Sequence, residues 1–250
     1  RTIHTSRSYR AGANALYFNV SPRQGFFDAA DGPVLEADLL TINDTPAGGQ
    51  SRWEVFRLAD EPAKPLDDET YSAGQSSWSF VPPLDVQLEK VGNAEKVAAG
   101  KASHGEDGRA SIEVAPLKPG VYRIVVQTDD PWGGQVSQER LFVVGGEAGE
   151  GVGVKAASVT LVQDDSYRPG QTARLVLGSA LSNTTYRMEI WAGRYLHETR
   201  LVRFDSPVTV VEVPVTQELE GGFTVRWFGV KDLDVHHGEA QVSVPYADSK

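Results

Sequence analysis

The amino-acid sequence predicts an all-β protein built from two antiparallel β-sandwiches in tandem. Short segments alternate apolar and polar residues, and no stretch shows a convincing period near 3.6 residues. In residues 121–128, for example, Tyr122, Ile124 and Val126 fall on one face of a strand, which suits a half-buried antiparallel sheet. The 25 glycines and 14 prolines among 250 residues are spaced between these segments as turn signals.

Taken in order, the alternating segments give the expected strands. They lie at residues 34–42, 121–128, 172–177, 201–204, 208–213 and 223–228. The best helical composition, residues 88–99, is interrupted by Gly92 and Asn93, so we expect residues 84–99 to add strands instead.

Residues 145–153 form the clearest linker. They contain five glycines, two glutamates and no aromatic residue, so we expect them not to pack and to stay flexible. The predicted domains are therefore residues 14–145 and 155–247, joined by a linker at 146–154. Residues 1–13 are expected to be a linker or the tail of a preceding domain.

An internal repeat relates the two predicted domains. Phe27 matches Tyr167 at an offset of 140 residues, whereas Ile112 matches Val211 at an offset of 99. The offsets differ by 41, which predicts an insertion in the first domain, placed around residues 59–105. Its part rich in Asp, Glu, Pro and Ser, residues 59–83, is expected to be an exposed excursion.

Composition excludes several classes of function. Lys and Arg number 24 against 34 Asp and Glu, and this net charge of -10 argues against a nucleic-acid partner, which needs a basic face. The apolar runs are far shorter than the roughly 18 residues of a membrane helix, so no transmembrane segment is expected. The absence of cysteine excludes disulfides, thiolate metal sites and cysteine nucleophiles.

Residues 232–236 are the candidate metal site. Asp232, Asp234 and His236 alternate on one strand face and could ligate a divalent cation. We favour a solvated edge strand there, because a metal site needs convergent ligands supported by a second shell, and charges also discourage edge pairing. We expect no metal, cofactor or catalytic residue.

The pairs 129–130 and 164–165 are two neighbouring aspartates each, and they could serve as glycosidase carboxylates or calcium ligands. Both precede turn signals, so capping of turns by Asp side chains is the favoured interpretation. The spacing of the five histidines gives no sign of a Ser-His-Asp arrangement.

The five tryptophans raise a sugar-stacking hypothesis. Trp53 and Trp191 occupy comparable places in the two repeats, so core positions are expected for both, with Trp78 exposed.

Tyr167, Pro169 and Gly170 are expected to be structural. Pro169 fixes φ at the second position of a turn, and Gly170 supplies the positive φ that a type II turn needs at the third. The Tyr167 ring should then cover one end of the second sandwich.

These motifs carry a family resemblance. Residues 118–133 and 139–144 resemble the closing strands of a macroglobulin-like domain. Residues 166–177, SYRPGQTARLVL, resemble the opening of the domain that leads into the bait region of bacterial α2-macroglobulins. Residues 186–191, 208–215 and 222–227 follow in the expected order. The long insertion and the glycine-rich acidic linker depart from the family pattern.

The resemblance implies two immunoglobulin-like sandwiches that serve as non-enzymatic scaffold in an extracytoplasmic protease trap. The implied partners are neighbouring domains of the parent chain and the proteases that the parent traps. No cysteine is present for a thioester, and no bait segment is identified. The alternative functions are a surface adhesin or carbohydrate-binding module and, less favoured, an accessory sandwich of a secreted hydrolase.

Overall fold

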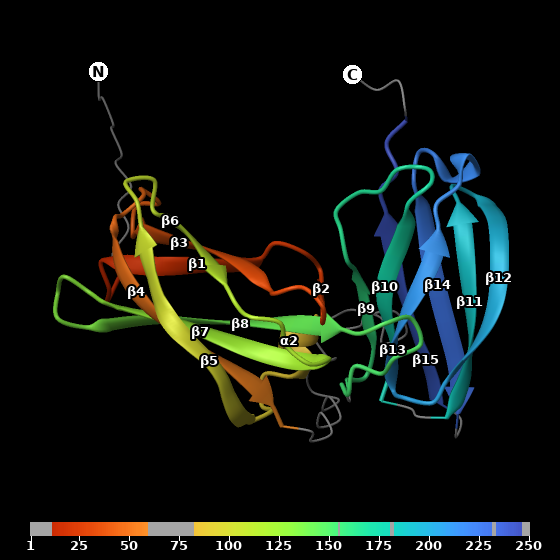
Figure 1. The fold of residues 1–250 in the computed structure, drawn as a ribbon, viewed down its shortest axis with the longest axis horizontal. Coiled ribbons are helices and arrows are strands. Elements are labelled where there is room, and N and C mark those ends of the chain that lie inside the picture. The colour runs from red at the N-terminus through yellow and green to blue at the C-terminus, as the bar shows by residue number, and fades with distance from the viewer. Residues whose placement is uncertain (1–11, 60–82, 155, 181–182, 232–233, 247–250) are drawn as a thin grey trace, which may run out of the picture.

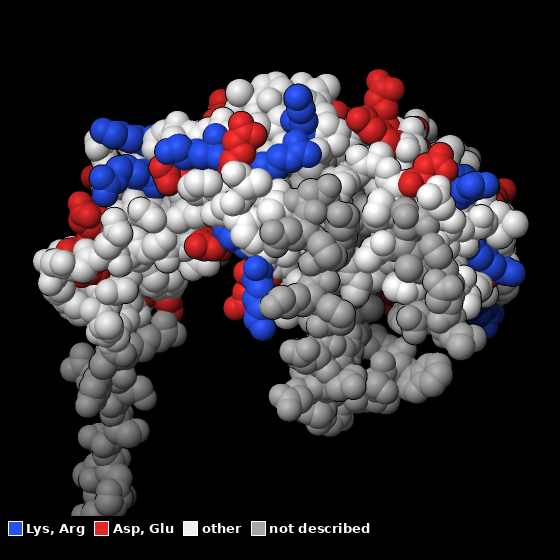
Figure 2. Space-filling model, turned by 90° about the horizontal axis from the view of Figure 1, so that it is seen from below, with Lys and Arg blue, Asp and Glu red and all other residues white. Residues whose placement is uncertain are grey.

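The computed structural model describes residues 12–59, 83–154, 156–180, 183–231 and 234–246. Of the residues that the structure describes, 59% lie in strands and 3% in helices, and the sheets are antiparallel, so the predicted all-β fold class is confirmed. No helix within the described ranges has the length and apolar character needed to cross a bilayer. On the face seen in Figure 2, the described acidic and basic side chains are intermixed rather than gathered into a basic patch.

The first sandwich packs a three-stranded sheet against a five-stranded sheet (Figure 1). The three-stranded sheet has the order β1 (Leu16–Pro22), β3 (Val34–Thr41), β6 (Arg109–Glu113). The five-stranded sheet has the order β2 (Phe27–Asp28), β8 (Gln135–Gly145), β7 (Gly120–Asp129), β4 (Gly49–Leu58), β5 (Asn93–His104). Alternate residues such as Leu35, Tyr122 and Ile124 fill the core between them.

The second sandwich packs a three-stranded sheet against a four-stranded one. The first has the order β13 (Val208–Pro214), β10 (Thr172–Gly178), β9 (Val159–Val162). The second has the order β12 (Tyr195–Phe204), β11 (Thr184–Ala192), β14 (Phe223–Lys231), β15 (Asp234–Val242). Tyr186, Trp227 and Met188 are buried between the sheets, and a short 3-10 helix, η1 (Gln217–Leu219), precedes β14.

The internal repeat is visible in the sheet topology. The order β1-β3-β6 corresponds to β9-β10-β13, and β8-β7-β4-β5 corresponds to β15-β14-β11-β12. The pairing registers reproduce both offsets, because Leu35 faces Ile112 as Leu175 faces Val211. The exact domain bounds given above stay predictions.

The insertion is shorter at its C-terminal end than predicted. β5 is the counterpart of β12, so the extra segment lies between β4 and β5, where the second sandwich has only the turn at residues 193–194. Residues 93–105 therefore belong to the repeat. The expectation of strands throughout 84–99 is also wrong at its start, because α2 (Leu84–Gln87) is a helical turn that follows Pro83. The insertion residues 60–82, including Trp78, lie outside the described residues.

The predicted linker packs, which corrects the expectation that it cannot. Val152 is 1% exposed, and its N–H donates to the Val208 carbonyl at 2.9 Å. The Gly149 N–H donates to the Val210 carbonyl at 2.9 Å, and Gly151 bridges to Thr209. The glycines leave the backbone free to run along the edge of β13, while the valine side chain is buried.

Candidate functional site: the junction between the two sandwiches

A third cluster of buried apolar side chains joins the two sandwiches, and it is the strongest candidate for a functional site. The first sandwich contributes Phe26, Leu58, Leu88, Val91, Val121 and Val143. The linker contributes Val152 and Val154, Ala156 follows it, and the second sandwich contributes Val159, Val176, Val208 and Val210. Because this apolar surface is buried, the sandwiches are held in one relative orientation.

The outer face of the sheet β13-β10-β9 is apolar where the matching face of the first sandwich is polar. Five outer residues of the second sandwich and their counterparts follow from the two offsets and the pairing registers. Val159, Leu161, Val176, Val208 and Val210 correspond to Asn19, Ser21, Glu36, Arg109 and Ser111. This sheet face is therefore apolar and covered in the second sandwich, whereas the matching face of the first sandwich is polar.

The sequence contained a signal for this junction that strand alternation alone missed. Leu175, Val176 and Leu177 are consecutive apolar residues, as are Val210 and Val211. Consecutive apolar residues within a strand place apolar side chains on both of its faces. The structure shows that both faces are buried, since Leu175 and Leu177 face the core and Val176 faces the junction.

Arg174 fastens the junction through charged and polar contacts. Its guanidinium forms an ion pair with Asp28, donates from Nη2 to the Gly146 carbonyl at 2.5 Å, and places Nε 3.6 Å from a Glu212 carboxylate oxygen. It thus connects β2, the linker and β13 from its position on β10. Burial raises the pKa of the Asp28 carboxyl. The Ala30 N–H and the Arg174 guanidinium together lower it by more, so this pKa lies below its usual value.

A second set of hydrogen bonds spans the junction on the side of the insertion. Gln87, at the end of α2, donates from Nε2 to the Ser158 carbonyl at 2.9 Å and accepts from the Ser158 N–H at 3.3 Å. The Ser158 hydroxyl donates to the His237 carbonyl at 2.7 Å. Ser158 therefore links Gln87, in the insertion of the first sandwich, to His237 on β15 of the second.

The loop before β2 approaches the second sandwich too closely for any residue but glycine. The Gly25 N–H donates to the Gln163 carbonyl at 2.8 Å, and a Cβ on Gly25 would lie 1.9 Å from the Val162 carbonyl oxygen. The neighbouring Gln24 donates from Nε2 to Asp164 at 2.7 Å. Asp164, expected only to cap a turn, thus contacts the other sandwich.

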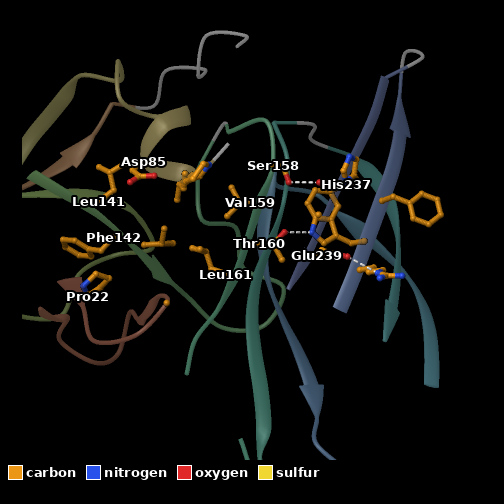
Figure 3. Close-up of a pocket in the computed structure, with 18 of the residues that line it drawn as sticks. Pro22, Asp85, Leu141, Phe142, Ser158, Val159, Thr160, Leu161, His237 and Glu239 are labelled. Carbon is orange, nitrogen blue, oxygen red and sulfur yellow. Dashed lines mark hydrogen bonds and ion pairs between the residues drawn. The ribbon is translucent and has the colours of Figure 1, made fainter. Parts of the chain in front are cut away.

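An open cleft of about 840 Å³ lies beside the junction (Figure 3). We call it the interdomain cleft. Its wall from the first sandwich consists of Pro22, Gly25, Pro83, Leu84, Asp85 and residues 140–143. Its wall from the second consists of residues 158–161, Glu189, residues 226–228 and residues 237–239.

The candidate metal ligands are not brought together as a described site. Asp232 lies outside the described residues, and Asp234 begins β15 without a described side chain. His236 places Nδ1 3.4 Å from the Ala157 carbonyl oxygen. Among the residues that the structure describes, no group of three or more potential ligands gathers.

Tyr167, Pro169 and Gly170 lie at one end of the second core. Gly170 has φ of 91°, and the Gln171 N–H donates to the Arg168 carbonyl at 3.0 Å across the turn. Tyr167 is 4% exposed within the core cluster, and its hydroxyl accepts hydrogen bonds from the N–H groups of Asp164 and Arg174. Burial raises the pKa of this phenol, although the two N–H groups act in the opposite direction. The structural role of these residues stays a prediction.

Asp130 caps its turn and also holds the start of β1. It accepts hydrogen bonds from the N–H of Trp132 at 2.8 Å and from those of Ala15 and Leu16 at 2.7 and 3.1 Å. Burial raises the pKa of Asp130, but the three N–H groups lower it by more, so it lies below its usual value.

The tryptophan expectations are correct for one repeat and wrong for the other. Trp53 packs against the first core. Trp191 instead lies beyond a register shift in β11, where its Nε1 donates to Glu189 and Arg226 stacks over its ring. Trp227 takes the core position, at 1% exposure.

Sequence reasoning also missed a serine–histidine pair. The Ser51 hydroxyl lies 2.8 Å from Nε2 of His104, and Nδ1 of His104 lies 3.0 Å from the Gly108 carbonyl oxygen. Ser51 is 2% exposed and His104 6%, so a substrate cannot reach the hydroxyl. The pair therefore satisfies buried polar groups rather than forming a nucleophile.

Comparison with known proteins places these observations in context. No family model matches the sequence, and no curated protein matches it. Solved structures do match. The chain resembles bacterial α2-macroglobulins over 94% of its length.

Trypsin-activated α2-macroglobulin from Escherichia coli is 9% identical with a TM-score of 0.35, and a Salmonella α2-macroglobulin mutant is 10% identical with a TM-score of 0.36. The chain spans 17% of the length of each. A tetra-tandem repeat from the extending region of a large adhesion protein is 16% identical with a TM-score of 0.29, and the chain covers 49% of it. With such low scores and identities, these likenesses do not establish family membership.

Proposed function

We propose that this chain is a non-catalytic scaffold segment of an extracytoplasmic, α2-macroglobulin-like inhibitor that traps proteases. The observation that carries the proposal is the packed junction, in which the linker and an apolar sheet face hold two sandwiches as one unit. The proposed family rests on the order of the sequence motifs at residues 166–177, 186–191, 208–215 and 222–227, which resembles that of bacterial α2-macroglobulins. Neighbouring domains of the parent chain and trapped proteases are the proposed partners.

The junction suits this role mechanically. A trap that closes around a protease must transmit a local cut into the movement of whole domains. Two sandwiches joined by a flexible linker would absorb such a movement, whereas a buried apolar interface transmits it. The Arg174 contacts to Asp28 and Gly146 add directional hydrogen bonds to the apolar packing.

The chemistry of the described side chains supports a role without catalysis. The closest nucleophile–base pair, Ser51 with His104, is buried in the first core. In the two aspartate pairs considered above, Asp130 holds a turn and the start of β1, and Asp164 contacts the other sandwich.

The adhesin or carbohydrate-binding alternative rests on one observation. Trp132, in the β7–β8 turn, is 65% exposed and offers a ring to a sugar. A glycan array separates the two proposals. Binding to a glycan that is lost in Trp132→Ala would favour the alternative.

The test of the trap is a protease-capture assay on the parent protein. A variant with Val176→Lys and Val210→Glu places two charges in the junction, and it should capture less trypsin than the unchanged protein. The matched control, Glu36→Lys with Ser111→Glu, changes the corresponding solvent-facing positions of the first sandwich and should capture normally. Equal capture by all three proteins would contradict the proposal.

A further inference from the structure

We propose that the interdomain cleft binds an uncharged, largely apolar polypeptide segment in an extended conformation. The inference concerns a ligand of the chain itself and does not depend on protease trapping. It rests on the strands that border the cleft, the side chains that line it, and the way its charges are already paired (Figure 3).

Each wall of the cleft contains a strand that pairs on one side only within the described ladders. β8 pairs with β7 throughout, but β2 joins its other side only at Val144 and Gly145, beyond the cleft residues 140–143. β1 packs beside β8 without a ladder and ends at Pro22, which lines the cleft. In the described ladders β9 pairs with β10 alone, and β15 packs beside it without a ladder. Strand edges of this kind offer alternate N–H and C=O groups to an added extended segment.

The side chains between these edges are apolar and incompletely covered. Leu84, Leu141 and Leu161 are partly buried, and Phe228, which also lines the cleft, is 40% exposed. The first three also belong to the apolar junction, so the lining continues an interface that is already packed. A bound segment with apolar side chains would remove this surface from water.

The charges that line the cleft favour an uncharged ligand. Arg140 lies 3.4 Å from Asp85 on one wall, and Arg226 lies 3.0 Å from Glu239 on the other. The fifth charged group, Glu189, pairs with Arg187 at 2.8 Å. Among the described lining residues, a charged segment would therefore find no opposite charge without an ion-pair partner of its own, so it gains little over an uncharged one.

An extended polypeptide suits the cleft better than a sugar does. Sugar binding relies on the exposed face of an aromatic ring. Of the described Phe and Trp rings that line the cleft, Phe142 is 3% and Trp227 1% exposed, so Phe228, at 40%, is left as a single stacking surface. The walls are also fixed before any ligand arrives, because Gln87 and Ser158 connect them across the junction. A preformed site of this kind loses little conformational entropy on binding.

The experiment measures fluorescence polarisation of a labelled, capped heptapeptide in which valine alternates with serine or threonine. Two companion peptides carry lysine or glutamate in place of threonine. The neutral peptide should bind the 250-residue chain saturably and more tightly than either charged companion. The variant Phe228→Glu should weaken binding by about tenfold or more, whereas the matched control Leu201→Glu should stay within about twofold.

Phe228 and Leu201 suit this comparison because both lie on the sheet β12-β11-β14-β15 and are exposed, at 40% and 76%, but only Phe228 lines the cleft. A second cleft variant, Leu141→Lys, repeats the test from the other wall, and circular dichroism shows whether each variant is folded.

Failure of the neutral peptide to bind saturably would overturn the proposal. So would equal binding of a charged companion, or equal weakening by Leu201→Glu. Displacement of the bound peptide by an oligosaccharide would assign the cleft to a different ligand class. None of these outcomes alters the protease-capture test, which probes the packed side of the junction.

Discussion

Replacing Gly25 by alanine should separate the two sandwiches locally and destabilise the chain. The new Cβ would lie 1.9 Å from the Val162 carbonyl oxygen, a backbone atom that cannot rotate away, so the loop must retreat. The retreat breaks the hydrogen bond from the Gly25 N–H to Gln163, worth about 0.5–1.5 kcal/mol. It also displaces Phe26, which is fully buried in the junction, and exposing such a ring costs about 1.5–3 kcal/mol.

The expected loss in the free energy of unfolding is therefore about 2–4 kcal/mol. For a chain of this size, this corresponds to a fall in Tm of roughly 4–16 °C. Urea denaturation followed by tryptophan fluorescence measures it. Gly92→Ala is the matched control, because a Cβ there meets nothing within 4 Å, and it should stay within about 0.5 kcal/mol. If Gly25→Ala were as stable as Gly92→Ala, the close approach across the junction would not exist in solution.

Three further predictions follow from individual residues. Gly170→Val should lower the free energy of unfolding by about 1–3 kcal/mol, because a φ of 91° is strained for a β-branched residue, although a Cβ there meets no atom within 4 Å. A neutral result in denaturant melts would refute the turn assignment. The folded-state pKa of Asp28 is lowered, so its contribution to stability is present above the unfolded-state pKa and is lost as the pH falls through the folded-state pKa. Asp28→Asn should therefore flatten the acid limb of a pH–stability profile, and an unchanged limb would contradict this. In limited proteolysis monitored by mass spectrometry, residues 145–153 should resist cleavage because Val152 and its neighbours are packed, and early cuts there would restore the flexible-linker prediction.

Local sequence signals predicted β3, β7, β10, β13, β14 and the end of β12, together with the turn at residues 168–171, because alternation and the Pro-Gly pair act over a few residues. The junction was not predicted, because its residues are distant in sequence. The apolar neighbours of Val176 and Val210 in the sequence indicate apolar side chains on both strand faces. The comparison with Glu36 and Ser111, the polar residues at the matching positions, then shows that the outer face differs between the two repeats. Composition also misjudged the linker, since glycine content describes the freedom of the unfolded chain and not the backbone hydrogen bonds available in the folded one.

The Arg174 contacts were equally invisible in the sequence. Its partners Asp28 and Gly146 lie far from it along the chain, and each is an ordinary loop or strand-end residue by type. The interdomain cleft depends on the same long-range packing. What the sequence could predict was therefore the repeated unit, and what it could not predict was how the two units meet.

The central claim is that the two sandwiches form one rigid unit, and a distance measurement between them tests it most directly. The chain has no cysteine, so Ser137→Cys on β8 and Thr199→Cys on β12 provide two spin-label sites at exposed positions. Double electron–electron resonance should give one narrow distance distribution, unchanged in Gly92→Ala and broadened in Gly25→Ala. A broad or multiple distribution in the otherwise unchanged chain would contradict the claim.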